Sequence, residues 1–194
     1  MYSFEQIPSG IPWPSGMEIS VEDSNLEFLK LAYIHYRFQL TFRPEFLKLS
    51  PTPSLFNLQN IEESVYEQIA TSWLTAWKEL IHKISKGHKS YDFSTDIGLQ
   101  NLDNLMDFNH EQFQLWRNEV QLRANPSNPI ALALQPELVC VEALIKAWED
   151  GLLTVVVSPI RGEFFDRVTP EVLIVSPSTR SDPRAYIESL SSGV

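Results

Sequence analysis

The sequence predicts an α+β fold, in which a mostly helical N-terminal two-thirds packs with a small C-terminal antiparallel β-sheet. Apolar residues recur every three or four positions between residues 21 and 149, as on one face of an amphipathic helix. After residue 152, β-branched and aromatic runs broken by turn residues replace that spacing, which is typical of strands. Helices that precede the strands, instead of alternating with them, favour α+β over α/β.

The first 19 residues are predicted to form an extended arm. Residues 7–16 read IPSGIPWPSG, and their three prolines and two glycines exclude a helix or an interior strand. Trp13 lies between two of these prolines. We favour the interpretation that Trp13 folds back as an anchor on the body of the protein. The alternative is an aromatic side chain that faces a partner from a polyproline-type segment.

The next segment carries two conflicting patterns. Apolar spacing of three and four runs from Leu26 to Leu40, while strict alternation, a strand signal, runs from Ala32 to Phe42. The helical pattern begins earlier and is longer, and Ser20 with Asp23 has the form of a capping box. We therefore predict a helix over residues 21–42.

Helical spacing is most regular over residues 61–86, and Gly87 stands where a residue just past the helix end is expected. Further helices are predicted near 101–107, from Asn109 onward, and over 137–149. On the apolar faces of these helices fall four tryptophans that we expect to be buried: Trp73, Trp77, Trp116 and Trp148.

The C-terminal sheet is predicted to have three strands, at about 153–159, 163–168 and 172–176, with a turn at Arg161-Gly162. Asp182 followed by Pro183 has the form of a helix start, because Asp caps the first amides and proline suits the first turn. A short helix over about 183–190 is therefore expected to close the chain.

Length and composition predict a single globular domain over residues 1–194 that holds together without a disulfide or a metal. The formal net charge is −10, which disfavours nucleic acid as a partner because phosphate binding needs clustered Lys and Arg. No run approaches 18 apolar residues, and no signal peptide is recognised, so we expect a cytoplasmic protein without a membrane span. Cys140 stands among aliphatic residues of a predicted helix and is expected to behave as a small buried hydrophobe.

Motifs for cofactor chemistry are not found in the sequence. The seven glycines form neither a dinucleotide-binding nor a phosphate-binding loop, and the four histidines form no HExxH or HxH pattern. No GxSxG sequence marks a nucleophile. We therefore expect no cofactor and no metal.

The candidate binding residues come from three places in the sequence. Trp13 represents the arm, and His35 and Arg37 stand among the aromatic residues of AYIHYRFQLTF. The third group lies in RGEFFDR, the densest mixed-charge segment, and consists of Arg161, Glu163, Asp166 and Arg167. For this group we favour cross-strand ion pairs on a solvated face, each of small value.

These observations indicate a non-enzymatic macromolecular interaction protein, such as an adaptor, an inhibitor or an immunity-type partner of unknown target. Another protein is the expected partner, and the sequence leaves the oligomeric state and strand order open. The alternative is an enzyme with a dispersed acid/base site that uses carboxylates, His35 and the C-terminal arginines, because catalytic groups can lie far apart in sequence.

Overall fold

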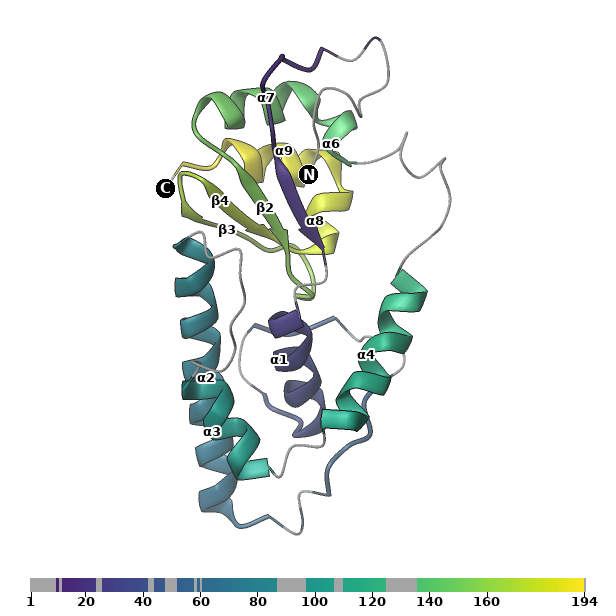
Figure 1. Ribbon diagram of the computed structural model, residues 1–194, viewed down its shortest axis with the longest axis vertical. Helices are drawn as coiled ribbons and strands as arrows, with labels where there is room; N and C mark the ends of the chain where they lie inside the picture. The colour runs from purple at the N-terminus through teal and green to yellow at the C-terminus, as the bar shows by residue number, and fades with distance from the viewer. Residues whose placement is uncertain are drawn as a thin grey trace. The chain divides into compact units, whose positions relative to one another are not determined.

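The computed structural model describes most of the chain and shows an α+β fold (Figure 1). The described residues are 10, 12–23, 26–41, 44–47, 52–57, 59, 61–86, 97–106, 110–124 and 136–193. They fall into two compact units, Met1–Asn25 with Ala124–Val194, and Leu26–Arg123. We call these the sheet unit and the helical unit and describe each by itself. That residues 1–194 form one domain stays a prediction.

The sheet unit contains a mixed four-stranded sheet with the strand order β1-β2-β4-β3. Strand β1 pairs parallel with β2, β2 pairs parallel with β4, and only β3 and β4 are antiparallel. The strands are β1 (Ser20–Asp23), β2 (Thr154–Val157), β3 (Phe165–Thr169) and β4 (Val172–Val175).

An antiparallel sheet with a turn at Arg161-Gly162 was predicted. This prediction is right for the pair β3–β4 and wrong for β2, which does not pair with β3. The hairpin joins β3 to β4 through Pro170 and Glu171, and β2 pairs with β4 instead of β3. Burial explains the order. All four residues of β4 are buried, as in a strand that has neighbours on both sides, while β3 is polar and partly exposed and lies at an edge.

Strand β1 was missed, because residues 20–23 were predicted to open a helix. The amide of Ser20 donates to the carbonyl of Leu153 at 2.9 Å, and Val21 lies opposite Val155 in the parallel register. A capping box is a weak local signal, and pairing with an apolar strand more than 130 residues away overrides it.

Helix α1 (Leu26–Arg37) is also shorter at its end than the predicted 21–42. Gln39 has a positive φ of 50°, the amide of Leu40 donates to the carbonyl of His35, and that of Gln39 donates to Tyr36. These two bonds form a Schellman motif, in which a residue with positive φ ends the helix. The chain therefore leaves the helix before Pro44, and the alternating pattern beyond Arg37 belongs to no strand among the described residues.

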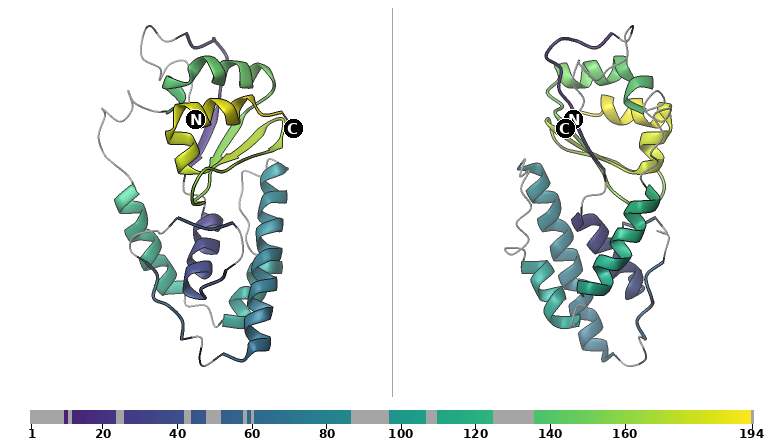
Figure 2. Two further views of the ribbon diagram at one scale, coloured as in Figure 1. Left: turned by 180° about the vertical axis from the view of Figure 1, so that it is seen from behind. Right: turned by 45° about the vertical axis from the view of Figure 1, so that its right-hand side comes forward.

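The described part of the sheet unit also contains four short helices: α6 (Pro136–Val139), α7 (Val141–Glu149), α8 (Pro177–Ser181) and α9 (Pro183–Ser191). Figure 2 shows α8 and α9 on one face of the sheet. The predicted start of α9 is confirmed, because the side chain of Asp182 accepts from the amides of Arg184 and Ala185 at 2.8 and 3.1 Å. The predicted helix over 137–149 is divided at Cys140 into α6 and α7.

The segment that precedes β1 belongs to the core of the sheet unit. Trp13 is 4% exposed, and Met17 and Ile19 are fully buried in the same cluster. The indole Nε1 of Trp13 donates to the carbonyl of Met17 at 3.0 Å. Trp13 is therefore buried in this core, as the favoured interpretation of an anchor predicts. Residues 1–9 of the predicted arm lie outside the described residues.

The helical unit consists of α1, α2 (Glu63–Ser85), α3 (Ile97–Met106) and α4 (His110–Ala124). The helix predicted over 61–86 is confirmed, and the predicted helix near 101–107 begins earlier. Gly87 and the side chain of Val120 lie outside the described residues. No helix in the described ranges has both the length and the apolar composition to cross a membrane.

Candidate functional site

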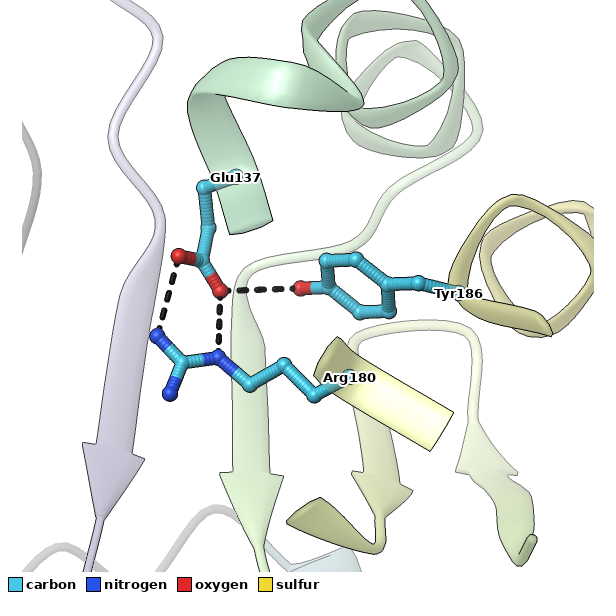
Figure 3. Close-up of polar contacts among 3 residues, drawn as sticks. All are labelled: Glu137, Arg180 and Tyr186. Carbon is cyan, nitrogen blue, oxygen red and sulfur yellow. Dashed lines mark hydrogen bonds and ion pairs between the residues drawn. The ribbon is translucent and has the colours of Figure 1, made fainter. Parts of the chain in front are cut away.

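A charged cluster is buried between three helices of the sheet unit (Figure 3). The carboxylate of Glu137 on α6 is 0% exposed and accepts from Nε of Arg180 at 2.7 Å and from Nη2 at 2.9 Å. The hydroxyl of Tyr186 on α9 donates to the same carboxylate at 3.2 Å. The arginine comes from α8, so this cluster joins α6, α8 and α9.

The cluster is explained by its structural role. A bidentate arginine–carboxylate pair fixes the relative orientation of its two side chains and is stronger than a single hydrogen bond. Burial raises the pKa of Tyr186 well above its ordinary value, and the negative charge of Glu137 raises it further. Tyr186 therefore stays a neutral donor to Glu137 at physiological pH. Both carboxylate oxygens of Glu137 accept hydrogen bonds from this protein's own side chains, so the carboxylate is used within the fold.

Cys140 lies next to this cluster and is buried, as predicted. Its thiol is 3.7 Å from the carbonyl oxygen of Pro183, and the residue is 2% exposed. Burial raises the pKa of the thiol, and the nearby charge of Glu137 raises it further. A thiol in this environment is a poor nucleophile, because the thiolate is the reactive form.

We expect Cys140 to react slowly with a maleimide or a disulfide reagent in the native protein and rapidly in denaturant. The reason is that both access to the sulfur and formation of the thiolate are suppressed by burial. Timed labelling followed by mass spectrometry measures both rates. Equal rates in the folded and unfolded protein would show that the region around α6 opens freely.

The charged residues of RGEFFDR lie in the sheet unit, on β3 and the connection that precedes it. Arg161 and Glu163 are exposed in that connection, and Asp166 is exposed on β3. Arg167 is half-buried and donates to the backbone carbonyls of Thr169 and Pro170. Desolvation lowers the pKa of its guanidinium, and the charge of Asp150 opposes that shift. Arg167 therefore holds the β3–β4 turn.

His35 belongs to an aromatic cluster of the helical unit. Its ring centroid is 5.3 Å from that of Phe46 and 5.7 Å from that of Trp73, and the residue is 9% exposed. His35 is therefore packed among aromatic side chains of the core. Arg37, the other candidate residue of this segment, makes different contacts.

Arg37 is held at the surface by neutral groups from three segments. Its Nη1 donates to Gln112 Oε1 of α4 at 2.9 Å and to the hydroxyl of Tyr33 at 3.2 Å, and lies 3.5 Å from Ser54 Oγ. The guanidinium carbon is 6.0 Å from the ring centre of Tyr33 and 5.8 Å from that of Phe56. Such distances allow cation–π attraction.

Two exposed leucines accompany this arginine. Leu55 is 62% exposed and follows Ser54, while Leu115 is 66% exposed and lies one helical turn after Gln112. Gln112 also donates to Ser54 at 3.3 Å, so the segment that carries Leu55 and the helix that carries Leu115 are joined beside Arg37. We call the group Arg37, Ser54, Leu55, Gln112 and Leu115 the Arg37 surface.

The helical unit also has an open groove of about 570 Å³ between α2 and α3. The described side chains that line it are polar: Ser64, Glu67, Gln68, Thr71, Ser72, Asn101 and Asn104. None of the sequence-predicted site residues lies there. Among the described residues, no three His, Cys, Asp or Glu side chains gather as a metal site would require.

Of the predicted site residues, Arg161, Glu163 and Asp166 are exposed, and Arg37 is partly exposed. Sequence reasoning missed Ser54, Gln112 and Leu115, which reach Arg37 only through tertiary contacts. It also missed Glu137, although this carboxylate shares an apolar helix face with Cys140, a pattern that indicates a buried charge with a partner. Comparison with protein-family models, curated proteins and solved structures found no match to this chain.

Proposed function

We propose that this chain is a non-enzymatic interaction protein, an adaptor, inhibitor or immunity-type partner, and that it binds another protein through the Arg37 surface. The observation that carries the proposal is the fixed guanidinium of Arg37, which is hydrogen-bonded to neutral groups only. The partner is proposed to be a cytoplasmic protein.

Preorganisation supports this use of Arg37. An arginine loses considerable side-chain freedom when it binds, and that loss weakens the complex. Here the contacts with Gln112 and Tyr33 already restrict the side chain before a partner arrives. Arginine is also among the residues that contribute most at protein interfaces, particularly where surrounding groups exclude water.

The exposed leucines supply the second requirement, which is apolar area. Leu55 and Leu115 are the two most exposed large hydrophobic residues in the described part of the chain. Single exposed leucines are common, but these two lie close in sequence to Ser54 and Gln112, which contact Arg37. Arginine and apolar side chains are both typical of interface centres. A dispersed enzyme site would need His35 to reach a ligand, and its ring lies among aromatic side chains.

The test is a capture experiment followed by affinity measurement. The full chain is immobilised, proteins from an extract of its source organism are identified by mass spectrometry, and binding of the purified partner is measured by calorimetry. Arg37→Gln should weaken binding about tenfold or more, the effect of losing one charge-assisted contact. Leu115→Asp should weaken it by a similar factor, because it places an unpaired carboxylate in the apolar part of the interface.

Matched controls come from the sheet unit. Arg184→Gln removes an exposed arginine, and Ile187→Asp places a charge at a position that is 43% exposed. Both should leave the affinity unchanged. If all four variants bind the partner as the unaltered chain does, the Arg37 surface is not the binding surface.

A further inference from the structure

We infer that Arg37 binds an aspartate or glutamate side chain of a different protein through the edge of its guanidinium formed by Nε and Nη2. This inference rests on the proposed function and adds the chemistry of the partner. It follows from the hydrogen bonds that Arg37 already makes, from its N–H groups that remain unused, and from the side chains around its guanidinium.

Unlike Arg180, Arg37 has no acidic side chain in direct contact among the described residues. Arg180 is paired with Glu137, and Arg167 donates to carbonyls near the charge of Asp150. Within the described part of the chain, Arg37 contacts no carboxylate, and its hydrogen-bond partners are a phenol, a hydroxyl and a carboxamide. Its positive charge is therefore not neutralised by a direct contact.

The unused donors of Arg37 lie on one edge. A guanidinium has five N–H groups, and every hydrogen bond described for Arg37 uses Nη1. No described hydrogen bond uses Nε or Nη2, and neither atom is among the fully buried polar atoms that lack a partner, so each keeps some exposure to solvent. Rings of Tyr33 and Phe56 lie near the guanidinium, so the direction left for a ligand is the Nε–Nη2 edge.

That edge matches a carboxylate. Its two N–H groups are parallel and meet the two oxygens of one carboxylate, which gives a two-pronged pair. A phosphate group is less suited, because it carries more charge and usually needs several cations or amides. Here Arg37 is surrounded by neutral acceptors, and the whole chain has a net charge of −10.

The leucines indicate that the carboxylate belongs to a protein. Leu55 and Leu115 are more than half exposed, and a free small acid would leave them in water. A partner that places aliphatic side chains around its acidic residue would cover both leucines and shield the ion pair. Acidic residues of this chain that lie more than about 8 Å from Arg37 repel a bound carboxylate little, since such charges are largely screened at physiological salt.

The first experiment uses nuclear magnetic resonance on the ¹⁵N-labelled full chain. The probes are two capped peptides of the sequence Ala-Leu-Xaa-Leu-Ala, with Xaa either glutamate or glutamine, together with sodium acetate and methyl phosphate. The Nε–Hε signal of Arg37 is assigned by its absence from Arg37→Lys. The glutamate peptide and acetate should shift that signal, and the glutamine peptide should not.

Three results would overturn the inference. The glutamine peptide could shift the signal as much as the glutamate peptide, no probe could shift it at all, or methyl phosphate could shift it at lower concentration than acetate. Sedimentation of the chain adds a further arm, in which a dimer that Arg37→Gln dissociates would assign the carboxylate to a second copy and contradict a different protein as its source.

The captured partner separates this inference from the proposed function. If Leu115→Asp weakens the complex and Arg37→Gln does not, the interaction surface stands and the carboxylate contact is wrong. If neither variant affects binding, the proposed function of this surface fails. If both weaken it, replacing acidic residues of the partner one at a time by the matching amides should identify one whose loss has no further effect in Arg37→Gln.

Discussion

Replacing Arg180 by alanine is expected to destabilise the sheet unit by about 3–5 kcal/mol, because the carboxylate of Glu137 stays buried without its counter-ion. Glu137 is 0% exposed and receives two hydrogen bonds from Arg180, and the remaining bond, from Tyr186, does not neutralise its charge. A typical domain is stable by only about 5–15 kcal/mol. Urea denaturation followed by circular dichroism measures the loss.

Two further variants separate the charge from the volume of the side chains. Arg184→Ala removes an exposed arginine from α9 and should change stability little. The double variant Glu137→Leu with Arg180→Met removes both charges and should recover most of the loss, since apolar replacements of buried pairs are often neutral or stabilising. A double variant as unstable as Arg180→Ala would show that packing, and not the unpaired charge, causes the loss.

Replacing Trp73 by alanine is expected to destabilise the helical unit by about 3–5 kcal/mol, the range for a large aromatic residue removed from a core. Trp73 is 0% exposed, and its ring stacks on that of Trp77 with centroids 5.9 Å apart. Its Nε1 also donates to the carbonyl of Leu31 on α1 at 2.9 Å, so the side chain ties α2 to α1. Denaturant unfolding followed by circular dichroism measures the change.

Trp73→Phe should cost less than Trp73→Ala, because a ring remains while the hydrogen bond to Leu31 is lost. Leu74→Ala provides the control at the neighbouring position, which is 38% exposed, and should have a small effect. A loss below 1 kcal/mol for Trp73→Ala would mean that the aromatic cluster contributes little to stability.

Burial of the aromatic residues could be predicted from the sequence only in part. Trp73 and Trp116 are 0% and 7% exposed, as their positions on apolar faces predict. Trp77 and Trp148 lie on the same predicted faces but are half-buried, because they stand at the margins of those faces. Helical spacing gives the direction of a side chain, whereas the extent of its burial depends on how far the neighbouring element covers that direction.

The candidate site could not be derived from the sequence beyond Arg37. Tyr33 is one helical turn from Arg37 and could be found by spacing, but Gln112 is 75 residues away and Ser54 is 17 residues away. Neither belongs to a recognisable motif. The buried pair of Arg180 with Glu137 was not predicted either, because its two residues are 43 positions apart in the sequence.

The sequence by itself determined the α+β class, the long helix α2, the start of α9 at Asp182 and the burial of Cys140. Each of these depends on the spacing of apolar residues or on a cap within a few positions of the chain. Only the tertiary structure decided that residues 20–23 form β1, that β2 pairs parallel with β4, and that Arg37 meets Gln112. Strand pairing and side-chain networks join residues that are distant in sequence, and their energy depends on neighbours that no local pattern specifies.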